Sequence, residues 1–270
     1  MTVNYDKENR KLQKLRVEIE RLGADKFKIE QERDRLNSIL AGMLHETRRL
    51  NLEINSFSEE LSKCLASGDM VGVRENAESI MFASGLISSR LTFSDFELNP
   101  VSLARQGKIR AGIYKKFDKS RRLLAKSWRS KGISVRLEGL SYAEIDAVPA
   151  FELVPFVLLD NAIKYSPDNQ DVKVLFEDRP NIDCHTRVTI SSVGPMVSPE
   201  EIEKLTERGY RGGFAHGSRI AGEGLGLYLA EILSATANAK LKIFSSAENL
   251  YSFNGIPYSA FWVELDFFKK

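Results

Sequence analysis

A short apolar stretch near the middle of the chain carries polar residues at the spacing of a binding face. Residues 158–167 read LLDNAIKYSP, and Asn161, Lys164 and Tyr165 lie three and four positions apart, so they share one face of a helix. The side-chain carbonyl oxygen of an asparagine is a hard ligand that suits Mg²⁺, and a lysine one turn later can meet a phosphate. The same pattern also suits the last turn of an ordinary helix, with Lys164 and Tyr165 as surface residues.

A glycine-rich turn further along the chain supplies a second motif. Residues 222–233 read GEGLGLYLAEIL, with Gly222, Gly224 and Gly226 at the start of a predicted helix. Backbone N–H groups at a helix N-terminus cradle phosphates when no Cβ stands in the way. The turn does not follow a strand directly, which argues against a Rossmann site, and it lacks the GK[ST] sequence of a Walker loop.

Together and in this order, the two motifs resemble the ATP-binding domain of sensor histidine kinases and of the wider GHKL superfamily, with gyrase, Hsp90 and MutL. The resemblance covers about residues 132–267. LLDNAIKYSP matches the asparagine box, ISSVGPMVSPEEIEKL lies where the first glycine box belongs, and ERGYRGG with RIAGEGLGLYLA resembles the lid and the second glycine box.

This resemblance implies ATP and Mg²⁺ as ligands and assigns roles to residues of this chain. Asn161 would ligate Mg²⁺, Lys164 and Arg211 would contact phosphate, and Tyr165 would pack near the nucleotide. The residues that would frame the phosphate tail are Gly222, Gly224, Leu225 and Gly226.

The first glycine box and the asparagine helix each depart from the family pattern. The first glycine box usually carries an aspartate that hydrogen-bonds the adenine amino group. Ser192 stands there in this chain, before Gly194, and Met196 replaces the second glycine. A serine hydroxyl can accept that hydrogen bond without charge, so we expect adenine binding to be weaker or water-mediated. Val157 stands four residues before Asn161, where the ATPase branches keep a glutamate; a valine cannot act as a base, which disfavours those branches.

The chain has three histidines, and one of them fits the acceptor motif of the same family. His45 and Glu46 begin the tetrapeptide HETR, and the family motif is a histidine, an acidic residue, a variable residue and an arginine. The resemblance implies that His45 accepts the phosphoryl group, with Glu46 taking a proton or orienting the ring. His185 lies in a predicted turn and His216 in the predicted lid, and neither has a partner in the sequence pattern.

The acceptor motif also departs from the family. The proline that usually follows is missing, and Arg49 replaces the polar residue found four positions after the histidine. We therefore expect little phosphatase activity towards a response regulator.

The elements that carry His45 are predicted to be helical. Over residues 8–66, apolar residues recur every seven positions in two lines offset by three, as in the seam of a coiled coil. His45 then falls at position f, away from the seam, where an ordinary solvated histidine is the alternative. The pattern breaks at residues 67–69 and resumes over 70–93, so a second helix folds back on the first. A hairpin with an exposed seam is expected to dimerise into a four-helix bundle.

The rest of the chain mixes helices and strands. Residues 93–100 predict a linker, and residues 109–131 predict a basic amphipathic helix whose charged face is only solvated. The remaining predicted elements are strands over 133–137, 171–176, 187–192, 241–245 and 259–267, helices over 150–165, 200–205 and 224–237, and a glycine-rich loop over 208–223. This mixture predicts one sheet with helices on one face.

The fold class is therefore α+β, with an N-terminal coiled coil and helical hairpin followed by an α/β sandwich, which the resemblance implies is of the Bergerat (GHKL) type. The predicted divisions are a coiled-coil input segment (1–40), a dimerisation and histidine phosphotransfer hairpin (41–96), a linker and basic helix (97–131) and an ATP-binding catalytic domain (132–270).

The composition argues against several other classes. The chain has 270 residues, of which 43% are hydrophobic, and a net charge of +2 with interleaved signs, which gives no support for nucleic-acid or membrane-surface binding. Cys64 and Cys184 have no CxxC spacing, so neither a disulfide framework nor a zinc site is expected and a reducing cytosol fits. No apolar run approaches the roughly 18 residues of a membrane helix, and the N-terminus lacks a signal-peptide core. We expect a cytoplasmic protein without membrane insertion.

These patterns are interpreted as a homodimeric protein histidine kinase. It would autophosphorylate His45 from ATP and pass the phosphoryl group to an aspartate on a response-regulator receiver domain. The coiled coil would receive input, for example from an upstream sensor protein. Two alternatives stay open. One is a catalytically degenerate GHKL nucleotide-binding switch or scaffold, which Ser192, Met196 and Val157 favour. The other is a GHKL serine kinase that phosphorylates a partner.

Overall fold

The computed structural model describes residues 5–98, 106–179, 183–217, 220 and 224–269. The chain divides into two compact units, Met1–Leu44 and His45–Lys270. One unbroken helix, α1 (Tyr5–Ser67), runs through both, as the heptad pattern predicts. The predicted boundary of the input segment at residue 40 falls inside this helix and stays a prediction.

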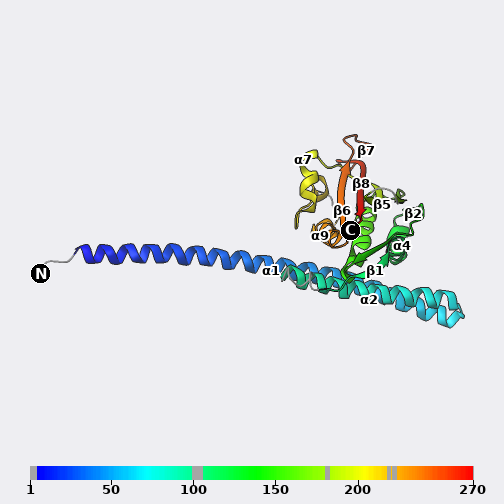
Figure 1. Ribbon diagram of the computed structural model, residues 1–270, viewed down its shortest axis with the longest axis horizontal. Coiled ribbons are helices and arrows are strands. Elements are labelled where there is room, and N and C mark those ends of the chain that lie inside the picture. Colours follow the sequence, from blue (N-terminus) through cyan, green and yellow to red (C-terminus); the bar gives the residue numbers. More distant parts are fainter. Residues whose placement is uncertain (1–4, 99–105, 180–182, 218–219, 221–223, 270) are drawn as a thin grey trace. The chain divides into compact units, whose positions relative to one another are not determined.

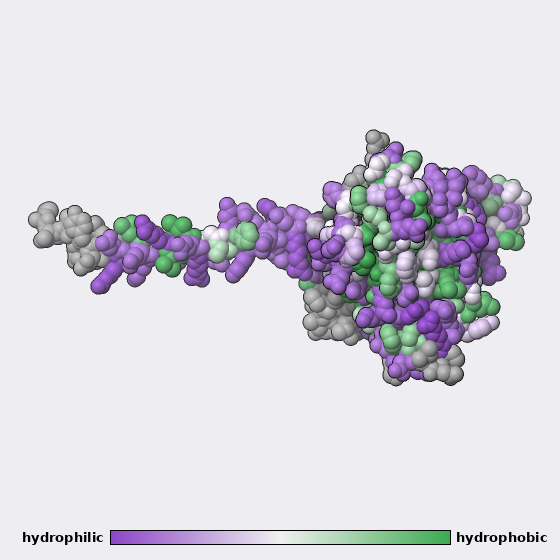
Figure 2. Space-filling view, turned by 90° about the horizontal axis from the view of Figure 1, so that it is seen from above, coloured by the Kyte–Doolittle hydropathy of each residue, from purple (hydrophilic) through white to green (hydrophobic). Residues whose placement is uncertain are grey.

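The apolar seam of the first unit is exposed in the single chain. Leu12, Leu15, Ile19 and Leu22 are each more than half exposed, and Figure 2 shows apolar patches among hydrophilic ones on this part of α1. A lone helix cannot bury such a seam by itself, so the exposure supports the expectation of a helical partner. Within the ranges given above, no helix combines the length and the apolar character needed to cross a membrane.

A tight turn folds the second helix, α2 (Met70–Leu98), back along α1, which confirms the predicted hairpin (Figure 1). Gly68 adopts a left-handed φ of 76°, and the Asp69 carboxylate accepts the Gly72 N–H at 3.0 Å, which caps α2. The predicted end at residue 93 is wrong, because the helix continues to Leu98. The last turns bury polar side chains that bond to one another and so favour helix, as when the Arg90 guanidinium donates to Ser94 Oγ at 3.1 Å.

The second unit contains a six-stranded sheet in the order β2-β4-β5-β8-β6, with β7 paired to β8. β2 and β4 run parallel and the other neighbours antiparallel. The strands are β2 (Ser134–Glu138), β4 (Asp171–Asp178), β5 (Cys184–Pro195), β6 (Ala239–Ser245), β7 (Tyr251–Phe253) and β8 (Ile256–Phe268). The predicted strands are thus confirmed, and the Asn254-Gly255 turn, with both residues at positive φ, joins β7 to β8.

Helices cover one face of this sheet, as predicted. Alternate residues of the central strands face a common apolar core with α4 (Ile113–Leu123), α6 (Leu153–Tyr165) and α9 (Gly226–Thr236). The strand residues in that core include Val172, Val174, Val188, Ile190, Val263 and Leu265. The α+β class, with a helical hairpin followed by a sheet covered by helices, is therefore confirmed.

The prediction of one basic helix over 109–131 is wrong. Residues Ile109–Gly112 form a strand, β1, paired antiparallel with β3 (Glu144–Ala147), and the helical part is divided into α4 and α5 (Ala125–Ser130). Pairing with a distant partner overrides the local pattern.

The charged face of that helical part is also not merely solvated. Lys116 forms an ion pair with Glu152. Lys126 Nζ donates to Ser56 Oγ at 2.9 Å, so these cations join α4 and α5 to their neighbours.

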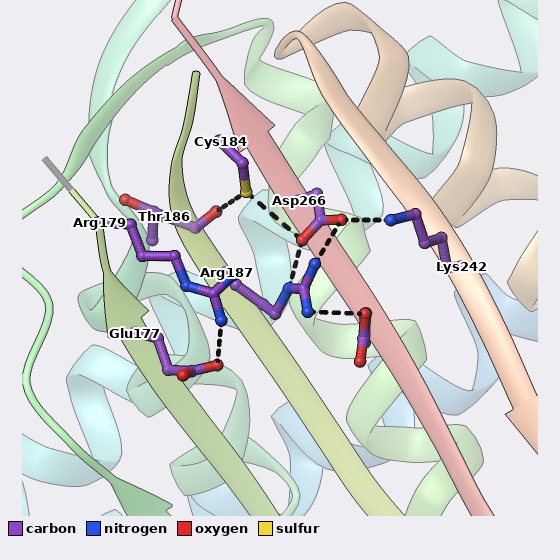
Figure 3. Close-up of polar contacts among 8 residues, drawn as sticks. Glu177, Arg179, Cys184, Thr186, Arg187, Lys242 and Asp266 are labelled. Atoms are coloured by element: carbon purple, nitrogen blue, oxygen red, sulfur yellow. Dashed lines mark hydrogen bonds and ion pairs between the residues drawn. The ribbon is translucent and has the colours of Figure 1, made fainter. Parts of the chain in front are cut away.

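The opposite face of the sheet carries an ionic cluster around Asp266 (Figure 3). Arg187 on β5 donates to both carboxylate oxygens of Asp266, at 2.6 and 3.0 Å, and Lys242 on β6 donates at 2.7 Å. Burial would raise the pKa of the Asp266 carboxyl, but the hydrogen bonds from Arg187 and Lys242 lower it to about 2. The Cys184 thiol donates to the same carboxylate at 3.5 Å. This cluster ties β5, β8 and β6 together.

Candidate nucleotide and phosphoryl-transfer site

The predicted asparagine helix is α6, preceded by a 3-10 turn, η1 (Pro149–Glu152). Asn161, Lys164 and Tyr165 are half-buried on the same side of this helix. The residues that bury its other side include Leu158, Leu159, Ala162 and Ile163. Val157, at the position of the ATPase glutamate, packs against the apolar core, so this position offers packing and no base.

Lys131, which the sequence reasoning missed, holds the end of α6. Its ammonium donates to the carbonyl oxygens of Ile163 at 2.8 Å and Lys164 at 3.2 Å, and also to that of Ser166. Helix C-termini leave such carbonyl groups without partners in the helix. Lys131 therefore fixes the turn that carries Lys164 and Tyr165.

Asn161 and Gly226 bring the two predicted motifs together. Gly226 is the first residue of α9, and Leu225 is its N-cap. A Cβ atom added at Gly226 would lie 2.8 Å from Asn161 Nδ2 and 3.3 Å from Asn161 Oδ1. The Asn161 carboxamide thus lies against the first turn of α9, whose N–H groups have no partner within the helix and can receive phosphate.

Gly224 meets two separate requirements for glycine. Its φ is 68°, and an added Cβ would lie 2.4 Å from Tyr210 O and 2.6 Å from Gly209 C. Its carbonyl also accepts the Gly209 N–H at 3.1 Å, which closes the base of the glycine-rich loop. Gly222, the remaining predicted glycine, lies outside the described residues.

Lys164 and Arg211, the two cations predicted to contact phosphate, have different partners in the structure. Lys164 Nζ lies 5.4 Å from the centre of the Tyr165 ring. Burial lowers the pKa of the Lys164 ammonium; Asp160 opposes that effect, whereas the cations Arg49 and Arg211 add to it. Burial therefore disfavours the charged form of Lys164, and a bound anion would stabilise it.

The side chain of Arg211 forms hydrogen bonds within its own loop. Its guanidinium donates to the carbonyl oxygens of Ala215 and Ile220, each at 2.7 Å. A contact with phosphate would require it to leave these carbonyls, so its predicted role stays a prediction.

The predicted adenine end lies on the sheet. Ser192 on β5 stands opposite Phe261 on β8 and faces the helix-covered side, two residues after the core residue Ile190. Its hydroxyl donates to the Phe261 carbonyl at 3.4 Å. Gly194 stands opposite Ser259, and a Cβ added there would lie 3.8 Å from Phe261 Cβ, an ordinary contact. Neither residue is in a strained conformation.

A glutamate that the sequence reasoning did not single out anchors the loop between the two boxes. Ser198 caps α7 (Pro199–Ile202) in a capping box with Glu201. Glu201 also accepts the Gly213 N–H at 2.7 Å and the Tyr210 hydroxyl at 3.1 Å. The bond from Gly213 is the main reason why the pKa of Glu201 is lowered. Gly213 opens α8 (Gly213–Gly217), so the predicted loop contains one helical turn.

His45 is exposed on α1, as its heptad position predicts. The residues around it contact α6: Arg49 donates to Glu46 Oε1 at 2.9 Å and to the Asp160 carboxylate. Asp160 directly precedes Asn161. The structure therefore brings the HETR segment and the asparagine helix together, through an arginine that the family pattern does not contain.

The other two histidines have less suitable surroundings. His185 Nδ1 lies 2.8 Å from Thr186 Oγ1, so the expectation that it has no partner is wrong. His216 is exposed in α8.

The donor set fits Mg²⁺ bound together with a polyphosphate. In the described part of the chain, no three His, Cys, Asp or Glu side chains are grouped to hold a metal ion. One hard oxygen ligand, Asn161 Oδ1, lies where the missing Cβ of Gly226 leaves space. An ion with one protein ligand and several phosphate and water ligands is the usual form of nucleotide-bound Mg²⁺.

Comparisons with known proteins match the part of the chain that contains both motifs. The family described as histidine kinase-, DNA gyrase B-, and HSP90-like ATPase matches residues 149–267. The histidine protein kinase SaeS of Staphylococcus aureus strain RF122 is 23% identical over 231 residues, and its counterpart in strain USA300 is 24% identical over 234. Each alignment covers 82% of this chain and 63% of the relative, so the chain spans less than two thirds of their length.

Solved structures give a weaker likeness. The mycobacterial sensor histidine kinase MprB is 20% identical with a TM-score of 0.45, over 59% of this chain and 97% of that one. The cytoplasmic segment of histidine kinase QseC gives a TM-score of 0.46 at 16% identity, over 68% of this chain and 93% of that one. Residues 149–267 are therefore similar to histidine kinase-, gyrase- and HSP90-like ATPase domains, and the two relatives that align with 82% of the chain are histidine protein kinases.

Proposed function

We propose that this chain, whose residues 149–267 belong to the histidine kinase-, DNA gyrase B-, and HSP90-like ATPase family, is an ATP-dependent protein histidine kinase that phosphorylates its own His45. The observation that carries the proposal is the contact between Asn161 and Gly226. It brings the proposed magnesium ligand to a helix N-terminus suited to phosphate, and the same helix α6 contacts Arg49, one turn after His45, through Asp160.

The reaction needs few chemical groups from the protein. A ring nitrogen of His45 would form a bond to the γ-phosphorus while the bond from that phosphorus to its bridging oxygen breaks, and ADP would leave with the electron pair. The other ring nitrogen would then lose its proton, and Glu46, the next residue, would take it. Mg²⁺, when bound, neutralises phosphate charge. Lys164 and the N–H groups at Gly226 would hold the triphosphate in place.

Further steps follow from the family. The phosphoryl group would pass to an aspartate of a response-regulator receiver domain, and the protein would act as a homodimer through the hairpin, with the coiled coil receiving input. Arg49 stands where the family has a smaller polar residue. We therefore propose that the protein dephosphorylates its regulator slowly. Rapid loss of label from a phosphorylated regulator on addition of this protein would contradict that proposal.

The direct test is incubation with γ-labelled ATP and Mg²⁺. We expect acid-labile, alkali-stable label on the chain, absent in His45→Ala and in Asn161→Ala. His185→Ala and His216→Ala are matched controls that should keep the label. Label that survives in His45→Ala would reject the assignment.

A second candidate is a nucleotide-binding switch without catalysis. It is favoured by Ser192, whose hydroxyl is bonded to the Phe261 carbonyl and brings no charge to the adenine end. Tight ATP binding with no label at any residue would support the switch over the kinase.

A further inference from the structure

Arg49 bonds to a neighbour of the proposed phosphoryl acceptor and to a neighbour of the proposed metal ligand. Its guanidinium bonds to Glu46 at 2.9 Å and to Asp160. Glu46 directly follows His45, the proposed acceptor, and Asp160 directly precedes Asn161, the proposed metal ligand. One side chain therefore links the sequence neighbours of both groups that must meet during transfer.

The surroundings of Arg49 make this link stronger than an ordinary surface ion pair. Its side chain is 30% exposed, that of Glu46 22% and that of Asp160 18%. Its guanidinium carbon also lies 4.8 Å from the centre of the Phe156 ring on α6. Burial would lower the pKa of the Arg49 guanidinium, but Asp160 and Glu46 together raise it. The cation is held by two carboxylates and an aromatic face at once.

Arginine suits this position better than lysine or glutamine does. Its planar guanidinium has donors pointing in several directions, so it can bond to two separate carboxylates. A lysine ammonium is a single compact charge and satisfies such a bridge less well. The amide of a glutamine cannot neutralise either acid.

We propose that Arg49 is a positioning residue for phosphoryl transfer. It holds the turn of α1 that carries His45 against helix α6, which carries the proposed metal ligand Asn161. This inference rests on the proposed kinase function and deepens it. Both partners lie on rigid helices, so fixing Arg49 against Asp160 fixes His45, one turn earlier on α1, relative to Asn161. Misplacement of reacting groups by about 1 Å can slow a reaction by about 100-fold.

The test separates positioning from nucleotide binding. In the whole protein, Arg49→Gln and Asp160→Asn should each slow labelling of His45 at saturating Mg-ATP by about 10-fold or more, with ATP affinity and melting temperature nearly unchanged. Arg49→Lys should fall between Gln and the unsubstituted protein. Lys63→Gln is the matched control, because Lys63 is an exposed cation on the same helix that pairs with a glutamate three residues before it, as Arg49 does, but lies far from the site; it should label normally.

A charge swap gives the readout that a merely structural role would not produce. Arg49→Glu alone should label slowly, and the double variant Arg49→Glu with Asp160→Arg should recover, because one cation again stands between two carboxylates. Faster labelling in the single variants would show that the link holds an inactive arrangement, and would overturn the proposal. Unchanged labelling would overturn it too.

Docking can also be measured without catalysis. Ser56 on α1 and Lys126 on α5 are in contact at 2.9 Å and lie outside the proposed site. Cysteines placed at both positions, with Cys64 and Cys184 changed to serine, should be joined by a short bismaleimide. Arg49→Gln should lower the yield of cross-linked protein several-fold. An unchanged yield would show that Arg49 does not hold α1 against the sheet domain. No label in the unsubstituted protein would reject the kinase function and, with it, the transfer role of Arg49, whereas normal label in Arg49→Gln rejects this inference alone.

Discussion

Two ionic clusters in this molecule are built from the same residue types but are arranged differently. Around Asp266, an arginine and a lysine surround one buried carboxylate on three strands of a single sheet. Around Arg49, two carboxylates surround one arginine, and they come from two helices far apart in sequence. The first cluster lies within a single sheet, whereas the second joins two helices that do not share a sheet or a hairpin.

The comparison shows that a shifted pKa does not by itself identify a functional site. The pKa of Asp266 is lowered and that of Arg49 is raised, each by opposite charges that outweigh burial. What distinguishes the Arg49 cluster is its surroundings. It adjoins Lys164, a cation whose pKa burial lowers, and Asn161, whose carboxamide lies against a helix N-terminus. A cation whose charged form burial disfavours, next to a carboxamide at a helix N-terminus, distinguishes the proposed site from the cluster around Asp266.

The largest effect should come from breaking the scaffold cluster. Asp266→Asn leaves Arg187 and Lys242 without their shared carboxylate, and unpairing a buried ionic group costs about 3 kcal/mol. Urea unfolding should show that loss of stability, while ATP affinity measured below the transition stays within about two-fold because the cluster lies on the face of the sheet away from the helices. A large loss of ATP affinity in a fully folded variant would mean that the two clusters are not separate in role.

The next effect belongs to the nucleotide site. Gly226→Ala places a Cβ within 2.8 Å of Asn161 Nδ2, so the carboxamide must move from the start of α9. We expect ATP affinity to fall about 100-fold, which is about 2.7 kcal/mol, with little change in melting temperature because alanine is the better helix former. Calorimetric titration measures the affinity. Gly23→Ala, where nothing lies within 4 Å, should leave it unchanged.

Acid should weaken the scaffold cluster in a defined range. The pKa of Asp266 is about 2 in the folded chain against an ordinary 3.8, so the folded state binds protons less readily than the unfolded state. Its contribution is therefore fully present above about pH 4 and is lost as the pH falls towards 2, by about 2 kcal/mol. Unfolding free energies of the unsubstituted protein and of Asp266→Asn should converge over that range. A constant difference between them would contradict this account.

Local signals in the sequence were sufficient for most elements. The heptad seam predicts α1, and the asparagine and glycine motifs predict the pair that meets at Asn161 and Gly226. The local pattern of residues 109–112 predicts helix and not strand, because their strand depends on pairing with β3, which lies more than 30 residues away. No local sequence pattern predicts which distant strand will pair with these residues.

The residues that hold the site together were harder to predict than those that would bind ligand. Lys131, Glu201 and Asp160 act through contacts with distant backbone or side chains, and nothing in their own neighbourhood signals that role. Arg49 was noticed only as a departure from a family motif. Its pairing with Asp160 requires the helices α1 and α6 to be placed in space, which periodicity does not supply.

The smallest effect should come from restoring charge at the adenine end. Ser192→Asp puts a carboxylate where a hydroxyl now donates to the Phe261 carbonyl, so the free protein loses that bond and some stability. A charge-assisted hydrogen bond to the adenine amino group should nevertheless strengthen ATP binding about 5-fold, roughly 1 kcal/mol. GTP, which has no amino group at that position, should not gain. Ser191→Asp, on the opposite face of β5, is the matched control. If Ser192→Asp weakens ATP and GTP alike, Ser192 does not face the base, and the adenine end of the site must be sought elsewhere on the sheet.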